Sequence, residues 1–424
     1  MRELRDVRHG DDRPDRQRPH AAPRAFQLVG GAHRGLRYAE TRGENLLGRV
    51  NMAAERGLVV AALGLVAWAL YLDVAIRNDP ISVDFHTYLA AAQVGLQHGW
   101  SHIYDQGIVA LQQARIAPGE RTQPFISPPA VALLVAPLSL FPFDSAYVIW
   151  AVVTLSAFAV AMALCATSTG LGRWVGVIGA LGPWWVMHAV NVGQVVPLVA
   201  AGMVVGWRLL RDRRDVLAGI AFASLLLKPN TAMLVPLALL FATRYRALAA
   251  WAGTTALLTL VAVAVIGPHG VSAYLDQMRG PWPSGADNVT LHGALGASGL
   301  YAAALRILIV AAVMGASFRL RRSPGLAVPV ALIGSLLVSP YLHGSDLCVL
   351  AAAGWMVWEE RPTFAWRALL AASWFLASPF LYLDGDSPYL TQWPWLEGVL
   401  FVALLMVAIG PLTAWADSRR RAPA

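Results

Sequence analysis

The sequence predicts an all-α, polytopic membrane protein. Of its 424 residues, 57% are hydrophobic and only 14% are charged, and the mean hydropathy is +0.53, whereas a soluble domain is about one quarter charged. Long apolar runs recur along the chain, and arginines gather between them, as in cytoplasmic loops beside anionic lipid. This pattern argues against a string of soluble domains. It also explains the net charge of +8 without nucleic-acid binding, since no basic face with interleaved aromatic residues is visible.

The N-terminal segment is predicted to be a disordered cytoplasmic tail. Residues 1–56 are polar, rich in Arg, Asp, Gly and Pro, and lack helical periodicity. An alternative start at Met52 would make this tail a gene-model extension. Residues 57–418 are predicted to form one integral membrane domain, whose first span covers Leu58 to Ile76. The arginine-rich flank before that span places its N-terminus inside the cell.

Residues 77–126 are predicted to form an external loop that contains amphipathic helices. The first helix begins near Asp84, and its small and apolar residues recur at the i, i+3, i+4, i+7 spacing of one helical face. A turn at Tyr104 and Asp105 follows, and then a second short helix near residues 108–115.

The later apolar runs, together with the first span, predict roughly twelve membrane spans. A second polar loop, 268–300, is expected on the external side, because the arginine clusters after it then lie in the cytoplasm. The runs lie at 128–141, 146–166, 173–187, 194–210, 215–243, 248–267, 301–318, 326–338, 345–358, 364–381 and 396–416.

The run at 215–243 has two interpretations. The arginines at 208–214 and 244–246 both favour the cytoplasm, yet this single run separates them. Splitting it at Lys228-Pro229-Asn230 into two short helices satisfies the local charge but disturbs the count of spans elsewhere. We therefore take one broken, proline-kinked passage as the working model.

Asp84 is the first candidate for chemistry. A carboxylate at the mouth of a membrane bundle is costly unless it has a function or a partner. It is ionised at neutral pH and only accepts hydrogen bonds, which suits a general base that takes a proton from an attacking hydroxyl. The alternative is a helix N-cap, for which Asp is also preferred.

Lys228 and three further residues are candidates for binding a phosphate or a sugar. Lys228 is the only lysine in the chain and lies in an apolar run, where its ammonium group either stabilises a phosphate leaving group, pairs with a buried acid or marks a helix end. Arg279 is a second phosphate candidate, with a surface cation as the alternative. His343 and Asp346 lie at i and i+3, and either contact substrate or cap the next helix.

No metal or other cofactor is expected. His86 lies two positions from Asp84 and would point away from it on a regular helix. A zinc ion between these two side chains would need a third ligand, and none is evident. Cys165 and Cys348 each lie in an apolar run without a CxxC neighbour, so both are interpreted as packing residues.

The order of several short motifs resembles glycosyltransferase family 87, over about residues 58 to 350. The motifs are Asp84 after the first span, the Tyr104-Asp105 pair, Phe125 with Pro128, Pro129 and Ala130, Pro137-Leu138 with Phe141-Pro142 and a later Trp150, Asn191 to Gln194, Leu227-Lys228-Pro229, and Asp287-Asn288 with Thr290. Many members have a tyrosine where this chain has Ser127, which puts a substrate contact at that position in doubt.

The resemblance implies a GT-C-type bundle and a lipid-linked donor. Asp84 matches the catalytic aspartate of the family. The expected reaction is an inverting transfer from a β-linked polyprenyl-phosphate sugar, with mannose as the expected sugar and arabinofuranose as the alternative. The expected acceptor is a glycolipid or glycan of the cell envelope, reached from the outer side of the cell membrane.

Two groups of residues are expected to hold these substrates. The donor phosphate is assigned to Lys228, Arg279 and His343, and the other substrate contacts to His86, Tyr88, Tyr104, Gln194, Asn288, His292 and Asp346. A transporter or lipid flippase is the alternative from another class. Transporters usually have paired inverted halves, whereas this chain has an asymmetric polar loop after its first span, which favours the enzyme.

Overall fold

A computed structural model describes residues 82–118, 122–279, 290–295, 299–360, 362–376 and 395–410. Within these ranges every regular element is a helix, which confirms the predicted all-α class. The chain divides into two units, 1–54 and 55–424, and all the described residues belong to the second. The predicted tail, the predicted first span and Asn288 lie outside the described residues.

The helices follow the predicted order of elements. The first loop contains α2 (Val83–His98), η2 (Trp100–His102) and α3 (Gln106–Ile116), which confirms the expected helix, turn and second short helix. The remaining elements are α4 (Pro129–Val135), η3 (Ala136–Leu140), α5 (Phe143–Cys165), α6 (Gly170–Leu181), α7 (Trp184–Asn191), α8 (Val196–Arg211), α9 (Asp215–Phe222), η4 (Ala223–Leu227), η5 (Pro229–Thr231), α10 (Val235–Phe241), α11 (Tyr245–Arg279), α12 (Leu291–Ala294), α13 (Gly299–Arg319), η6 (Leu320–Arg322), α14 (Pro324–Val338), η7 (Gly344–Leu347), α15 (Cys348–Glu359), α16 (Phe364–Leu376) and α17 (Trp395–Ile409).

Among the described residues, three helices are long and apolar enough to cross a membrane: α5, α11, and α13 together with η6. Their surfaces carry exposed large apolar side chains, such as Leu164, Leu260 and Leu308. Apolar side chains in this number are stable at a surface that faces lipid rather than water. The chain is therefore a membrane protein, while the full set of roughly twelve spans stays a prediction.

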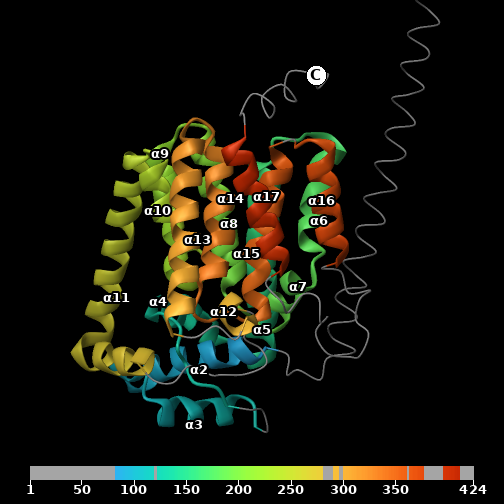
Figure 1. The fold of residues 1–424 in the computed structure, drawn as a ribbon. Coiled ribbons are helices and arrows are strands. Elements are labelled where there is room, and N and C mark those ends of the chain that lie inside the picture. Colours follow the sequence, from blue (N-terminus) through green and yellow to red (C-terminus); the bar gives the residue numbers. More distant parts are fainter. Residues whose placement is uncertain are drawn as a thin grey trace, which may run out of the picture. The chain divides into compact units, whose positions relative to one another are not determined.

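α2 is a buried helix, and the prediction that it is amphipathic was wrong. Its side chains from Phe85 to Ala92 are all buried, including the polar His86 and Thr87. α3, α4 and η3 pack against it, and α2 lies with α3 across one end of the upright helices (Figure 1). The small residues at Ala90 to Ala92 allow helices to approach from several sides, so the helix is covered all round from Phe85 to Ala92.

The run at 215–243 is a pair of short helices, so the working model of one kinked passage was wrong. α9 and η4 lead to Lys228, which has a non-helical backbone (φ −152°, ψ 81°), and η5 and α10 lead back. The two ends of the run meet, since Arg244 Nη1 lies 3.4 Å from Asp215 Oδ1. Pro229 lacks the N–H that a continuous helix would need. The chain therefore reverses here, and Lys228 lies at the apex.

Arginines and polar connections gather at one end of the helices. Arg211 pairs with Glu360 at 3.1 Å, and Trp207 Nε1 donates to the Gly325 carbonyl at 2.9 Å, so the connections after α8, η6 and α15 are neighbours. The arginines near this end are Arg208, Arg211, Arg213, Arg214, Arg244, Arg246, Arg319, Arg321 and Arg322. We call it the arginine end.

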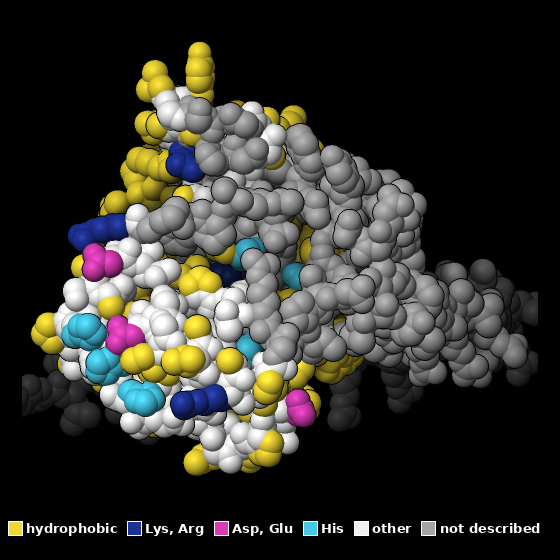
Figure 2. Space-filling view, turned by 90° about the horizontal axis from the view of Figure 1, so that it is seen from below, with side chains coloured by type: hydrophobic (Ala, Val, Ile, Leu, Met, Phe, Trp, Pro, Cys, Tyr) yellow, Lys and Arg dark blue, Asp and Glu magenta, His cyan; other side chains and the backbone are white. Residues whose placement is uncertain are grey.

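The opposite end carries α2 and α3. α8 runs between the two ends and covers about 24 Å at 1.5 Å per residue. Seen from the α2 end, histidine and acidic side chains gather at one edge of the molecule (Figure 2).

α11 continues beyond its membrane-length part as a short arm. Gly267 has φ 64° and precedes Pro268, so the helix bends there, as Figure 1 shows at its lower end. Residues 268–279, which we call the α11 arm, are helical, and the predicted loop 268–300 was therefore wrong over this stretch. The arm packs against η2 of the first loop.

Candidate active site

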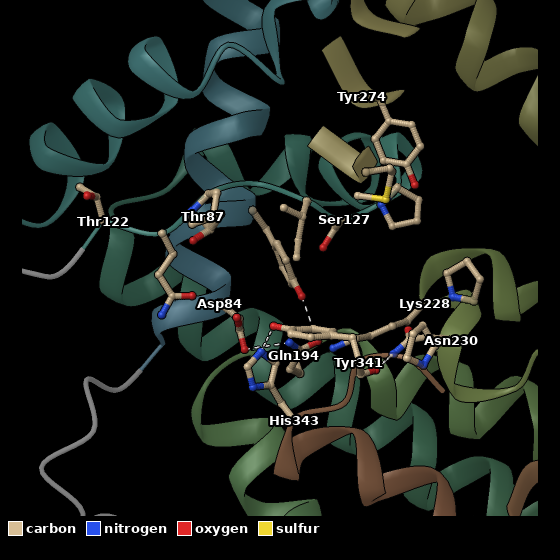
Figure 3. A pocket seen from close by; sticks show the side chains of 18 residues that line it. Asp84, Thr87, Thr122, Ser127, Gln194, Lys228, Asn230, Tyr274, Tyr341 and His343 are labelled. Carbon is tan, nitrogen blue, oxygen red and sulfur yellow. Dashed lines mark hydrogen bonds between the residues drawn. The ribbon is translucent and has the colours of Figure 1, made fainter. Parts of the chain in front are cut away.

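A pocket of about 390 Å³ opens among the elements at the α2 end. Figure 3 shows polar side chains from α2, from the Lys228 apex and from the segment before η7 directed into it. The lining residues are Asp84, Thr87, Tyr88, Thr122, Gln123, Pro124, Ile126, Ser127, Pro128, Gln194, Lys228, Pro229, Asn230, Tyr274, Met278, Pro340, Tyr341 and His343. Six segments that lie far apart in the sequence thus line this one pocket.

The N-terminus of α2 is held by the backbone of the turn between α7 and α8. The amide of Ser82 donates to Asn191 O at 2.8 Å, and the amide of Asp84 donates to Val192 O at 2.9 Å. These carbonyls accept from backbone N–H groups at the start of the helix, which a capping side chain would otherwise have to satisfy. Ser82 occupies the N-cap position, so Asp84 is not the cap. Its carboxylate is free to face the pocket.

Gly193 makes this contact possible. Its backbone has φ +73°, and a Cβ added there would lie 2.4 Å from the Cβ of Phe85. Trp150 Nε1 donates to the Gly193 carbonyl at 2.8 Å and fixes the turn from its other side. The Asn191 to Gln194 motif therefore fixes the position of the N-terminus of α2.

We expect Gly193→Ala to lower the free energy of unfolding by about 3 kcal/mol, because a left-handed backbone and an overpacked contact each cost about 1–3 kcal/mol. The melting temperature of the detergent-solubilised protein measures this. Gly253→Ala is the matched control, since a Cβ at Gly253 in α11 meets no atom within 4 Å. Equal melting temperatures for the two variants would contradict the tight contact.

Asp84 is the end of a short chain of hydrogen bonds. Tyr88 Oη donates to Gln194 Oε1 at 2.9 Å, and Gln194 Nε2 donates to Asp84 Oδ2 at 2.8 Å. Burial, together with the charge of Asp84, raises the pKa of Tyr88 well above its ordinary value, so its phenol remains a donor. The orientation of the Gln194 amide is thereby fixed toward the carboxylate.

The pKa of Asp84 is raised above its ordinary value. Burial is the largest cause, and Lys228, His343 and the Gln194 hydrogen bond oppose it by favouring the charged form. A carboxylate with a raised pKa is a stronger proton acceptor than an exposed one. The proton affinity of this carboxylate is therefore set by its surroundings.

Lys228 pairs with an acid inside the bundle and still reaches the pocket. Its Nζ lies 2.6 Å from Asp346 Oδ1, and 14% of its side chain is exposed. Asp346 is fully buried and also accepts from the His343 amide at 3.0 Å as part of a capping box. The ion-pair alternative is thus what the structure shows, with Asp346 behind Lys228 rather than at the pocket surface.

His343 enters the pocket beside Tyr341. The Tyr341 hydroxyl contacts His343 Nε2, and the Tyr341 carbonyl accepts from Asn230 Nδ2 at 2.8 Å. Asn230 follows the Lys228 apex directly, so this bond joins the apex to the segment before η7. Neither Tyr341 nor Asn230 was among the candidate site residues predicted from the sequence.

Two glutamines of α3 hold the extended segment 122–128, which forms one wall. The Gln106 side chain donates to the Phe125 carbonyl and accepts from the Phe125 N–H, and Gln113 does the same with Gln123, at distances between 2.7 and 3.1 Å. Tyr104 Oη donates to the Ser127 carbonyl at 2.7 Å. The sequence analysis missed both glutamines, although their spacing of seven residues places them on one face of α3.

Two other candidates, His86 and Arg279, do not line the pocket. His86 is fully buried, with Nε2 2.8 Å from the Gln113 carbonyl, so it joins α2 to α3. Arg279 is 75% exposed and pairs with Asp276, as a surface cation does. His292 lies in α12, and its side chain lies outside the described part of the structure.

These features define an all-helical membrane protein with a polar pocket in which a carboxylate and an ammonium group face one cavity. The family model of glycosyltransferase family 87 matches residues 125–340, which is half of the chain. The chain belongs to this family and is a glycosyltransferase, which confirms the resemblance. Searches of curated proteins and of solved structures found no match.

Proposed function

We propose that the protein is an inverting glycosyltransferase that uses a polyprenyl-phosphate sugar. The observation that carries this proposal is that Asp84 and Lys228 line one pocket of a chain that also has apolar helices of membrane-spanning length. A sugar phosphate needs a cation at its phosphate and a base at the attacking hydroxyl. A long apolar chain on the phosphate needs access to lipid, which a membrane enzyme offers.

In the proposed reaction the acceptor hydroxyl attacks the anomeric carbon of the sugar. Its proton passes to an Asp84 oxygen as the new C–O bond forms. The bond between the anomeric carbon and the phosphate oxygen breaks, and its electron pair leaves with the phosphate. Lys228 and His343 stabilise that developing charge, and Asp346 positions Lys228 through the ion pair. One displacement inverts the anomeric centre, so a β-linked donor gives an α-linked product.

The distribution of arginines supports an outer location for the pocket. Short cytoplasmic connections carry an excess of Lys and Arg. The arginine end lies at the far end of α8 from Gln194, so the pocket would face the periplasmic or outer side. A glycolipid or glycan of the cell envelope is the proposed acceptor there.

A transfer assay tests this function. Purified protein would be given polyprenyl-phosphate mannose, or polyprenyl-phosphate arabinofuranose in a parallel arm, with glycolipids extracted from a strain that lacks the protein. We expect transfer from the mannosyl donor and an α-linked product by NMR. Transfer from the arabinosyl donor alone would contradict mannose as the donor sugar and assign arabinofuranose instead. A β-linked product from a β-linked donor, or lipid movement across vesicles without transfer, would overturn the proposed reaction.

The pH profile tests the role of Asp84 as a base. A base acts in its ionised form, so kcat/KM is high above the pKa of Asp84 and falls as the pH drops through it. Because that pKa is raised, we expect the acid limb above the ordinary value of about 3.9. Gln194→Leu removes a hydrogen bond that favours the carboxylate, so the limb should move to still higher pH. A limb that stays or moves to lower pH in this variant would contradict the assignment.

A further inference from the structure

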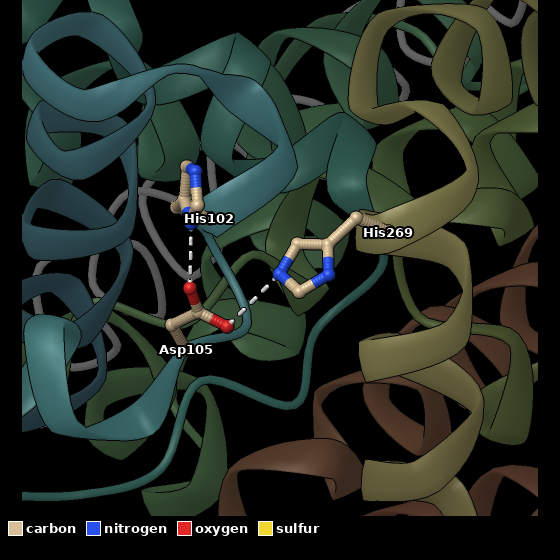
Figure 4. Close-up of side chains that lie close together, drawn as sticks. All are labelled: His102, Asp105 and His269. Atoms are coloured by element: carbon tan, nitrogen blue, oxygen red, sulfur yellow. Dashed lines mark hydrogen bonds and ion pairs between the residues drawn. The ribbon is translucent and has the colours of Figure 1, made fainter.

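A second group of metal-ligating side chains lies outside the pocket, on the first loop and the α11 arm. His102, Asp105 and His269 each offer one ligand atom, and these atoms all lie within 4.8 Å of one another. Figure 4 shows both imidazoles directed at the one carboxylate. Among the described residues, no other group of three such side chains brings its ligand atoms this close together.

The distances fit a divalent transition-metal ion. His102 Nδ1 lies 2.6 Å from Asp105 Oδ2, and His269 Nε2 lies 3.5 Å from Asp105 Oδ1. Ligands of a tetrahedral Zn²⁺ ion, at about 2.0–2.2 Å from the metal, are roughly 3.4 Å apart. The second distance already meets this value, and the first would open by less than about 1 Å. Two imidazoles and one carboxylate suit zinc and its neighbours better than Mg²⁺ or Ca²⁺.

The site is also accessible. The side chains of His102, Asp105 and His269 are 39%, 29% and 58% exposed. An ion can therefore enter from solvent, and water can complete its coordination. Three protein ligands with one open position is a common zinc arrangement.

The three ligands come from two parts of the chain, the first loop and the α11 arm. His102 ends η2, Asp105 precedes α3, and His269 lies just after the bend of α11. Further along the same arm, the Tyr274 ring packs 4.9 Å from the Tyr104 ring, and Tyr274 and Met278 line the pocket. A bond between these elements would fix one pocket wall.

We propose that His102, Asp105 and His269 bind a divalent transition-metal ion such as Zn²⁺, which fastens the α11 arm to the first loop. The ion stands apart from Asp84 and takes no part in the transfer chemistry. Its role is to hold Tyr274 and Met278 in place. The proposal does not depend on which sugar or acceptor the enzyme uses.

Zn²⁺ itself is the probe. Full-length protein in detergent, with any affinity tag removed, would be stripped with a chelator and titrated with Zn²⁺ by calorimetry, and with Co²⁺ by visible absorption. We expect one saturable site per chain and slower hydrogen exchange in residues 268–279 when Zn²⁺ is bound. His269→Ala and Asp105→Asn should each weaken binding by at least about 100-fold, since loss of an outer-shell partner alone costs up to that much.

His98→Ala is the matched control. His98 is an exposed histidine at the end of α2 and is no member of the cluster, so this variant should bind Zn²⁺ as the wild type does. Absence of saturable binding to wild-type protein would overturn the proposal. The three side chains would then only contact one another. Equal Zn²⁺ binding by wild type and His269→Ala would also overturn the proposal, because the ion would then be held by other residues. Because His269 is on the surface, its loss should leave the protein folded, which the melting temperature checks.

Discussion

Replacing Asp84 with asparagine should lower kcat by at least about 10³-fold, while the protein stays folded. Loss of a general base typically costs about 10²–10⁴-fold, and a factor of 10³ is about 4 kcal/mol of transition-state stabilisation. Asparagine has nearly the same shape and can still accept the hydrogen bond from Gln194 Nε2. The melting temperature should therefore change little, and donor binding should persist.

Asp144→Asn is the control for this change. Asp144 is an exposed acid in the first turn of α5, away from the pocket lining, and the same substitution there should leave kcat within about two-fold of wild type, as expected for surface changes. An Asp84→Asn enzyme with full turnover would remove Asp84 from the mechanism. A collapse of melting temperature would instead show that the carboxylate is needed for folding.

Replacing Lys228 with glutamine should affect both activity and stability. We expect kcat/KM to fall by about 10²–10³-fold, because a group that stabilises developing charge is lost. The change also leaves Asp346 buried without the ammonium group at 2.6 Å, and breaking a buried pair from one side costs about 3–5 kcal/mol. Initial rates and thermal unfolding of the same preparation measure the two effects.

A double variant separates these effects. Lys228→Gln combined with Asp346→Asn removes both charges, so stability should largely return while activity does not. Arg244→Gln is the matched control, since Arg244 and Asp215 form a partly buried pair at the arginine end, with 20% and 17% of their side chains exposed. It should cost stability without a comparable loss of kcat/KM. Recovery of activity in the double variant would mean that Lys228 acts only as a structural partner of Asp346.

Composition and short motifs were enough to predict the all-α class and the family. Asp84 and Lys228 are conspicuous because a charge is rare and costly in such an apolar chain. Gln194 was predicted from its motif, and the structure brings all three into one pocket. Their roles in catalysis stay predictions until the kinetic experiments are done.

Tertiary packing explains what the sequence could not predict. The face of α2 looked amphipathic, but burial of His86 depends on a carbonyl of Gln113, 27 residues away. The reversal at Lys228 brings the two ends of the run together, where Arg244 pairs with Asp215. The sequence does not reveal that these two residues form an ion pair. The same holds for His269, whose distance from Asp105 follows only from the bend at Gly267.

A single-turnover experiment tests the role of Asp84 most directly. Enzyme preloaded with radiolabelled donor is mixed with acceptor, and bound donor and glycosylated product are followed in the same sample. We expect Asp84→Asn to hold the donor as wild type does and to form product at least about 10³-fold more slowly. Product formation at the wild-type rate from a fully loaded variant would contradict the proposal that Asp84 takes the proton.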